Sequence, residues 1–252
     1  MADQRRVPVG ASLVESLYAV HTAGMVAPAS IADLRRIPYF DALTDATAAA
    51  FAKELGVRAL GPRELLFSMG DRTEGFYFLR SGKARIFRTG PDGREQVLRL
   101  VAPGDTFGEV PALDGGASPA SVETLEACEV ILVPAERFTR LVLANPAVGL
   151  SMLARFARRL RGFTELVEQL SLQTVPSRLA RYLFQTAREE GIETPDGVVI
   201  GRELTMQDLA AVVGSVREVV SRTMRTFEQD GIVEVRRKEI VVRDIEALRR
   251  ML

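Results

Sequence analysis

Four polar side chains between residues 217 and 222 share one face of a predicted helix. Arg217, Glu218, Ser221 and Arg222 stand at positions i, i+1, i+4 and i+5, which brings them together on one exposed helical surface. An arginine matches the O6 and N7 acceptors of guanine, and a glutamate can accept from the amino group of cytosine, so Glu218 and Arg222 could contact one G·C base pair. The same spacing also fits an ordinary ion pair between Glu218 and Arg222 on a solvated helix.

Two short helices joined by a tight turn would position these side chains. Thr205, followed three residues later by Asp208, is a capping arrangement at a helix start, and Gly214 supplies the turn before the second helix. The two helices and two following β-type runs are expected at residues 205–213, 216–229, 232–235 and 240–242. This order is typical of a winged helix-turn-helix, whose second helix enters the major groove of DNA.

A long amphipathic helix is predicted before this module, from Asn145 to Thr174. Its apolar residues recur in the pattern of a coiled-coil seam, and we assign to that seam Leu153, Phe156, Leu160, Phe163, Val167 and Leu170. A second copy of the chain, related by a two-fold axis, is the simplest partner for such a seam. A helix buried only on its own domain is the alternative. Thr174 and Pro176 are expected to end this helix and begin the next, over residues 177–190, before a short strand at 198–200.

Short β-type runs fill the segment from Val57 to Val133 and alternate with turn glycines. The runs are residues 64–67, 75–79, 84–88, 96–101 and 130–133. Pro91, Asp92 and Gly93 form a turn signal between two of them, so those two strands should pair antiparallel. Strands at this spacing predict a β-barrel or β-roll. A helical region broken at Pro38 precedes it, with Thr44 capping its second helix.

We therefore expect an α+β fold in four parts. These are an N-terminal extension (1–30) with a short amphipathic helix at 11–24, a β-roll sensor domain (31–144), a dimerisation helix (145–174) and a winged helix-turn-helix domain (175–252).

Composition excludes several classes of protein. The chain of 252 residues carries 33 basic and 33 acidic side chains, so its net charge indicates neither the presence nor the absence of nucleic-acid binding. With one histidine, His21, and one cysteine, Cys128, the sequence can build neither a zinc finger nor an iron–sulfur cluster nor an intrachain disulfide, and we predict no metal site. No run of 18 apolar residues suggests a membrane span, and the single thiol favours a reducing cytoplasm. The semi-apolar N-terminus leaves a signal peptide as a minor alternative.

Two motifs in the expected order carry a resemblance to a known family. Residues 204–210 (LTMQDLA) and 213–222 (VGSVREVVSR) resemble the helix-turn-helix of the cyclic-AMP receptor protein and fumarate–nitrate reductase regulator family. Upstream, residues 103–110 (PGDTFGEV) and 113–116 (LDGG) resemble its effector-pocket signature. The resemblance covers the chain from about Ile31 to its C-terminus and implies a homodimeric transcription regulator on palindromic double-stranded DNA, which contacts RNA polymerase if it is an activator.

The resemblance also implies roles for individual residues. Positions matching Glu218, Ser221 and Arg222 contact bases in the family, and that of Arg217 contributes in some members. Thr205 and Gln207 match positions that contact DNA phosphates in the family, and we add Ser215 to this group. The candidate effector pocket consists of Gly108, Glu109, Ser118, Ala120, Ser121, Phe163 and Thr164.

This pocket departs from the cyclic-nucleotide pattern. Members that bind cyclic nucleotide place an arginine and a serine before the alanine of this loop, whereas this chain has Ser118, Pro119 and Ala120. The loop therefore lacks a charge-assisted partner for a phosphate. Phe163 stands where a small hydroxyl would contact the purine, and we expect Gly108 to form a turn and Glu109 to cap loop amides. We predict that cyclic AMP is not the effector and that the pocket takes something apolar or nothing.

Other kinds of sensor and one enzyme class are alternatives. No cofactor is predicted, but His21 could ligate a haem and Cys128 could be a redox sensor, although a packed histidine and a small core cysteine are the plainer interpretations. A cupin-like barrel enzyme needs several histidines inside the barrel, and none occurs between Val57 and Val133, so we expect no enzymatic activity.

Overall fold

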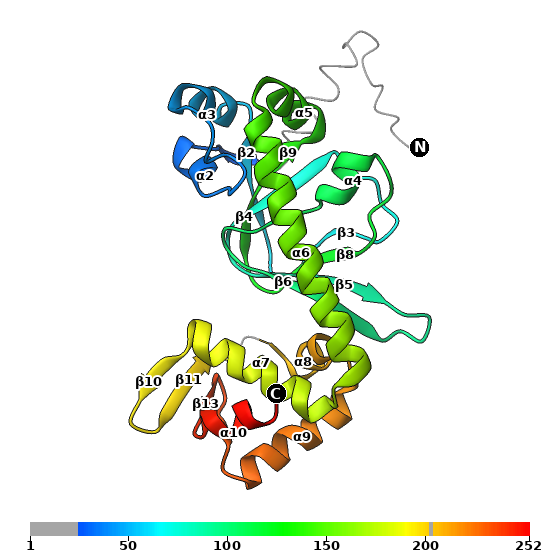
Figure 1. Cartoon of the computed structure of the whole chain (residues 1–252), viewed down its shortest axis with the longest axis vertical. Helices are drawn as coiled ribbons and strands as arrows, with labels where there is room; N and C mark the ends of the chain where they lie inside the picture. Colours follow the sequence, from blue (N-terminus) through cyan, green and yellow to red (C-terminus); the bar gives the residue numbers. More distant parts are fainter. Residues whose placement is uncertain (1–24, 202–203) are drawn as a thin grey trace, which may run out of the picture.

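A single helix of 27 residues, α6 (Pro146–Leu172), links the two halves of the molecule, a β-roll at one end and a module of helices and strands at the other (Figure 1). The computed structural model describes residues 25–201 and 204–252, so the helix expected at residues 11–24 and its His21 lie outside the described residues. In the part of the chain that is described, no helix is long and apolar enough to cross a membrane.

Two antiparallel sheets form the β-roll. The larger has the strand order β1-β2-β9-β4-β7 and the smaller the order β3-β8-β5-β6. Their bounds are β1 Met25–Pro28, β2 Gly56–Leu60, β3 Leu65–Phe67, β4 Gly75–Ser81, β5 Ala84–Thr89, β6 Glu95–Val101, β7 Thr106–Phe107, β8 Ser121–Thr124 and β9 Cys128–Pro134. The β5–β6 pairing and the left-handed Gly93 confirm the hairpin predicted from Pro91 to Gly93. Residues 25–28, which were predicted to belong to the N-terminal extension, form β1 and pair with β2.

Four short helices pack on this roll: α2 (Ile31–Arg35), α3 (Asp45–Ala52), α4 (Glu109–Asp114) and α5 (Ala135–Ala144). Ser30 and Asp33 form a capping box on α2, and Thr44 caps α3 as its sequence predicted. Buried aromatic side chains join these helices to the larger sheet; they are Tyr39, Phe40, Phe76 and Phe138. The core of the roll therefore lies between its strands and this cap of helices.

The C-terminal module has a core of its own. It contains α7 (Val175–Glu190), β10 (Ile192–Thr194), β11 (Gly197–Gly201), α8 (Met206–Val213), α9 (Arg217–Gln229), β12 (Val233–Val235), β13 (Glu239–Val242) and α10 (Ile245–Arg250). Thr174 caps α7, and Thr205 with Asp208 forms the capping box of α8, as predicted. Leu179, Leu183 and Phe227 are buried at its centre. The order of α8, turn, α9 and strand pair is the predicted winged helix-turn-helix.

Helix α6 presents an uncovered apolar stripe. Leu153, Leu160 and Val167, at seven-residue steps, have exposed fractions of 62%, 68% and 63%. Phe156 instead packs against the core of the roll, and Phe163 and Leu170 are less exposed, at 44% and 37%. The predicted seam therefore has two sides: one faces the roll, and the heptad side is largely exposed in the part of the chain that the structure describes.

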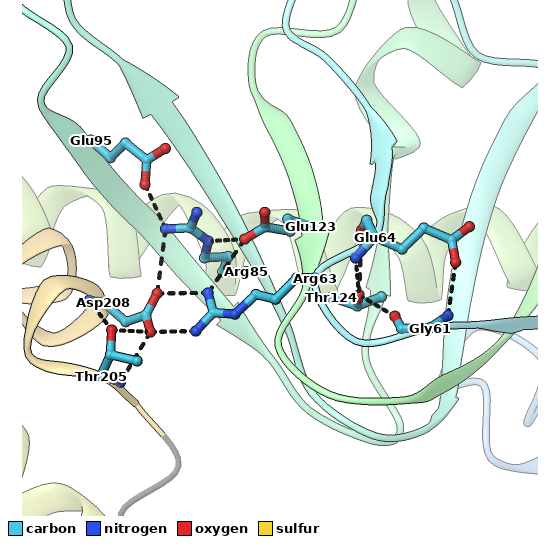
Figure 2. A network of polar contacts seen from close by, with 9 residues as sticks. All are labelled: Gly61, Arg63, Glu64, Arg85, Glu95, Glu123, Thr124, Thr205 and Asp208. Carbon is cyan, nitrogen blue, oxygen red and sulfur yellow. Dashed lines mark hydrogen bonds and ion pairs between the residues drawn. The ribbon is translucent and has the colours of Figure 1, made fainter.

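The module contacts the roll mainly through α8, and an ion pair between Lys83 of the roll and Glu190 of α7 adds a second contact, with Nζ and Oε2 2.8 Å apart. Phe87 and Val97 of the roll form a small apolar cluster with Ala211 of α8, and the Gln96 amide donates to the Ala211 carbonyl at 3.2 Å. Beside this cluster, the Arg63 guanidinium donates two hydrogen bonds to the Asp208 carboxylate, at 2.8 and 2.5 Å (Figure 2). The contact thus combines an apolar patch with a bidentate ion pair.

The Asp208 carboxylate should make stability depend on pH in the acid range. Its burial alone would raise its pKa, but hydrogen bonds from Arg63 and Thr205 outweigh burial and lower the pKa from 3.8 to about 2. A lowered folded-state pKa gives stabilisation that is complete above about pH 4 and is lost as the pH falls through the folded value. We expect Asp208→Asn to lower the free energy of unfolding by up to about 2 kcal/mol at neutral pH, and by almost nothing near pH 2. Urea unfolding followed by circular dichroism checks this; a difference that stays constant with pH would contradict it.

Candidate functional site

The first turns of α9 present the predicted base-contacting face to solvent. Arg217, Glu218 and Arg222 are exposed and Ser221 is half-buried. The opposite face is fixed because Val220, Met224 and Phe227 are buried in the core of the module. Within the described residues no ion pair joins Glu218 to Arg222, so the alternative of an intrahelical pair finds no support. Figure 1 shows α9 at the end of the molecule farthest from the β-roll.

The predicted phosphate-contacting residues lie at the start of α8 and in the turn before α9. Thr205 is exposed; its hydroxyl donates to Asp208 Oδ2 at 2.6 Å and accepts from the Asp208 amide at 3.1 Å. Gln207 is exposed two residues further on, and Ser215 is half-buried, with its amide donating to the Ala210 carbonyl at 2.9 Å. The structure therefore brings two of the three side chains to one helix end and puts Ser215 in the turn.

One arginine that no sequence pattern predicted fixes this turn. Arg178 of α7 donates to the carbonyls of Val213 at 2.6 Å, Gly214 at 3.1 Å and Gln173 at 2.6 Å. It thereby joins the ends of α6 and α8. Gly214 has φ of 66°, and a Cβ there would lie 2.4 Å from Leu170 Cδ2, so the turn requires glycine. The role of Arg178 depends on contacts with residues distant in the sequence, whereas the residues next to it have the pattern of an ordinary helix.

A cavity of about 450 Å³ lies between the β-roll and α6. Of the predicted pocket residues, five line it: Gly108, Glu109, Ser118, Ala120 and Phe163. Ser121 and Thr164 do not. The Ser121 hydroxyl accepts from the Met69 amide at 2.9 Å, and the Thr164 hydroxyl donates to the Leu160 carbonyl at 3.0 Å. Most of the remaining wall is apolar, formed by Phe67, Ile86, Leu98, Val110, Pro111, Val122, Phe156 and Leu160.

Glu109 anchors α6 to the roll. Its Oε1 accepts from the Tyr39 hydroxyl and from Arg159 Nη1, both at 2.7 Å, and its side chain is only 4% exposed. Arg159 also donates to the Thr106 carbonyl at 2.5 Å and to the Thr106 hydroxyl at 2.9 Å. The expectation that Glu109 caps loop amides is therefore wrong: a guanidinium and a phenol satisfy it. Gly108, in contrast, has the positive φ of 81° that its predicted turn requires.

Burial governs the electrostatics of this wall. Burial and the neighbouring Glu109 raise the pKa of Tyr39, which stays protonated and donates to the carboxylate. Burial alone would lower the pKa of Arg159, but Glu109 reverses the shift and raises it. Arg99, the other arginine lining the cavity, has a pKa lowered by burial and by Arg159, and it donates to the Thr106 carbonyl at 2.7 Å. Both guanidiniums therefore already contact groups of the protein, although the buried Arg159 Nε has no hydrogen-bond partner within residues 25–201 and 204–252.

The loop that would hold a phosphate is closed on itself. Ser118 is buried, and its hydroxyl donates to the Ala120 carbonyl at 2.7 Å. Pro119, between them, has no N–H to offer. The loop, residues 118–121, contains no arginine that could bind a phosphate.

Cys128 has the environment of a core residue. It is 3% exposed and its thiol donates to the Lys83 carbonyl at 3.3 Å. Burial raises the pKa of the thiol, which disfavours the reactive thiolate. Among the described residues there is no cluster of histidine, cysteine and carboxylate side chains that could hold a metal ion.

Known proteins resemble both halves of the chain. Residues 57–145 match the family described as "Cyclic nucleotide-binding domain" and residues 177–251 the "Crp-like helix-turn-helix domain". The Cyclic AMP receptor protein of Thermus thermophilus is 32% identical over 183 residues, which cover 73% of this chain and 82% of that protein. The CRP-like cAMP-activated global transcriptional regulator of Mycobacterium tuberculosis is 28% identical over 217 residues, 86% of this chain and 97% of that one.

A solved structure has the same fold. A transcriptional regulator of the CRP/FNR family from Thermus thermophilus superposes with a TM-score of 0.65 at 22% identity, covering 77% of this chain and 97% of that one. Two matched domains in the same order, a relative above 30% identity and the exposed helix-turn-helix face lead to one assignment. The chain belongs to the Crp/Fnr family of DNA-binding transcription regulators.

Proposed function

We propose that the protein works as a homodimer in the cytoplasm, with each subunit reading one half of a palindromic DNA site. The observation that carries this proposal is the face of α9, where Arg217, Glu218 and Arg222 are exposed while the opposite face is buried. These three side chains and Ser221 contact bases, and Thr205, Gln207 and Ser215 contact phosphates. In a dimer of this kind the two half-sites lie about 10 bp apart. If the protein is an activator, RNA polymerase is a further partner.

The uncovered stripe of α6 supports the dimer. Leu153, Leu160 and Val167 expose more than half of their surface along one side of the helix, and burying such a stripe against its two-fold copy is favourable. Arg155 and Arg159 point to the other side, where they bind Asp105 and Glu109 of the roll. The heptad side is thus left for a partner helix.

Cyclic AMP is not the effector in this proposal, although the relatives named above are a cyclic AMP receptor protein and a cAMP-activated regulator. A cyclic phosphate would need a cation, and Arg99 and Arg159 already bind Thr106 and Glu109. The Ser118 hydroxyl is engaged within its own loop. The mostly apolar wall suits an uncharged ligand, or the cavity stays empty and DNA binding is constitutive. The burial of Cys128 gives the redox alternative no support.

Replacing Arg222 should separate base contact from phosphate contact. On an operator selected from random DNA, Arg222→Ala is expected to cost about 1–3 kcal/mol at one G·C pair of each half-site and to relax the preference there. Gln207→Ala should instead weaken binding to all sequences alike, because a contact to the phosphate backbone carries no sequence information. Fluorescence anisotropy with single-base operator variants measures both. A uniform loss for Arg222→Ala would refute the assignment.

A charge in the α6 stripe should separate the subunits. Val167→Asp places a carboxylate in the proposed interface, so we expect a monomer at concentrations where the wild-type protein is dimeric, with weaker operator binding in parallel. Sedimentation velocity and anisotropy report the two effects. Arg158→Asp, on an exposed position of the same helix away from the stripe, is the matched control. Equal sedimentation of the two variants would exclude this face as the interface.

Operator affinity should not respond to cyclic AMP. Because the guanidiniums of Arg99 and Arg159 already bind groups of the protein, we expect no calorimetric heat on titration with cyclic AMP and the same operator affinity with and without it. The Thermus thermophilus Cyclic AMP receptor protein serves as the positive control in the calorimeter. Binding of DNA that depends on cyclic AMP would show that Ser118 and Phe163 had been misinterpreted. An absorption spectrum of the purified protein, in which a Soret band would indicate haem, completes the test.

A further inference from the structure

We propose that Arg63 is a positioning residue for DNA binding: through Asp208 it fixes α8, and with it α9, in the orientation that DNA requires. The inference rests on the proposed DNA-binding function. Arg63 lies in the β-roll, 145 positions before Asp208 in the sequence, and has no place in the helix-turn-helix itself. Its effect on DNA is therefore indirect.

The Asp208 carboxylate makes two kinds of contact at once. Its Oδ2 accepts from the Thr205 amide at 3.0 Å and from the Thr205 hydroxyl at 2.6 Å, which closes the capping box of α8. The same carboxylate accepts both hydrogen bonds from Arg63, and its side chain is only 5% exposed. The N-terminus of α8, where Thr205 and Gln207 lie, is thereby attached directly to the roll.

A second layer of charges surrounds this pair (Figure 2). Arg85, 8% exposed, binds Glu95 at 2.7 Å and Glu123 at 2.8 Å, and its Nη1 lies 3.8 Å from Asp208 Oδ1. Arg63 also lies 3.5 Å from Glu123. Two arginines thus alternate with three carboxylates, so that each charge faces opposite charges. Such a network restricts the geometry of the contact more than one exposed ion pair would.

The turn that carries Arg63 is itself well fixed. Arg63 has φ of 60° and is the one residue other than glycine with positive φ among the described residues. Its amide donates to the Thr124 carbonyl at 3.1 Å, and the Gly61 amide donates to Glu64 Oε2 at 2.7 Å. The Glu64 amide donates to the Thr124 hydroxyl at 2.8 Å. The guanidinium therefore projects from a rigid point of the roll.

The contact covers α8 on its roll side and leaves α9 uncovered. Phe87 and Val97 of the roll bury Ala211, while Arg217, Glu218 and Arg222 stay exposed. The core of the module does not depend on the pair, since it is built from other residues of α7 to α10. Loss of the pair should therefore loosen the orientation of a folded module. A protein whose competent orientation is only partly populated binds with an affinity reduced by that fraction.

The test is Arg63→Gln, with Arg80→Gln as a matched control. Arg80 also pairs with a capping-box aspartate, Asp33 of α2, at 2.9 Å, and that aspartate is also 5% exposed, but the whole arrangement lies inside the β-roll. Hydrogen bonds to a charged group stabilise the contact between α8 and the roll, and their loss should lower the population of the competent orientation. We therefore expect Arg63→Gln to weaken operator binding by about 10-fold to 100-fold, and Arg63→Lys by less. Arg80→Gln should leave operator affinity within about 2-fold of wild type, since it touches neither module nor DNA.

Two further readouts distinguish positioning from other roles. The salt dependence of binding should stay as in wild type, because no phosphate contact is lost. Spin labels at Arg72→Cys in the roll and Glu193→Cys in the module, both exposed, should give a broader distance distribution in Arg63→Gln and not in Arg80→Gln. Melting temperatures of the two variants provide the measure of any general loss of stability.

Each outcome has one meaning. If wild type binds no DNA, the proposed function fails. If wild type binds and Arg63→Gln binds equally well, or the distance distribution does not change, this inference alone is wrong. Tighter binding by Arg63→Gln would also overturn it, because the contact would then oppose DNA binding. A reduced salt slope would mean that Arg63 touches phosphate itself.

Discussion

The attachment of α8 to the β-roll is the constraint on which the DNA-binding end of this molecule depends. α8 is fixed at its N-terminus by Arg63 and at its C-terminus by Arg178, whose guanidinium binds the carbonyls of Val213 and Gly214. The direction of α9 follows from that of α8, because both helices are buried in one core and are joined by the tight turn at Gly214. Two arginines from different parts of the chain thus bind the two ends of the helix that precedes the four candidate base-contacting side chains.

Helix α6 is attached by a second set of arginines on the opposite side of its apolar stripe. Arg155 binds Asp105, and Arg159 binds Glu109 and Thr106, so the roll takes up the polar side of the helix and leaves the heptad side for a partner. The same contacts line the cavity with cations that are already paired. A phosphate bound in this cavity would compete with the protein's own groups for the same guanidiniums. The apolar character of the remaining wall is consistent with a cavity that does not bind a phosphate.

Much of the fold follows from local signals in the sequence. The caps at Thr44, Thr174 and Thr205, the turn at Gly93 and the seven-residue period of α6 were all predicted, because each depends on residues within one or two turns of chain. The strands that escaped prediction are β1, β2, β7, β8 and β10. Most of them are short: β7 has two residues, β10 has three, and β8 is the four-residue run SVET. Glu109 was assigned to loop amides because its true partners, Tyr39 and Arg159, are 70 and 50 positions away.

The two capping boxes show where sequence reasoning stops. Ser30 with Asp33, and Thr205 with Asp208, have the same local pattern, and both form the same cap. In both, an arginine distant in sequence pairs with the buried aspartate, Arg80 in the first case and Arg63 in the second. One pair lies within a domain and the other joins two domains, a difference that no local pattern records. The carboxylate of a capping aspartate is already held in place by its cap and can still accept further hydrogen bonds. A guanidinium that the tertiary fold brings near it gains charge-assisted hydrogen bonds. The entropy cost of this contact is small, because only the arginine side chain loses conformational freedom.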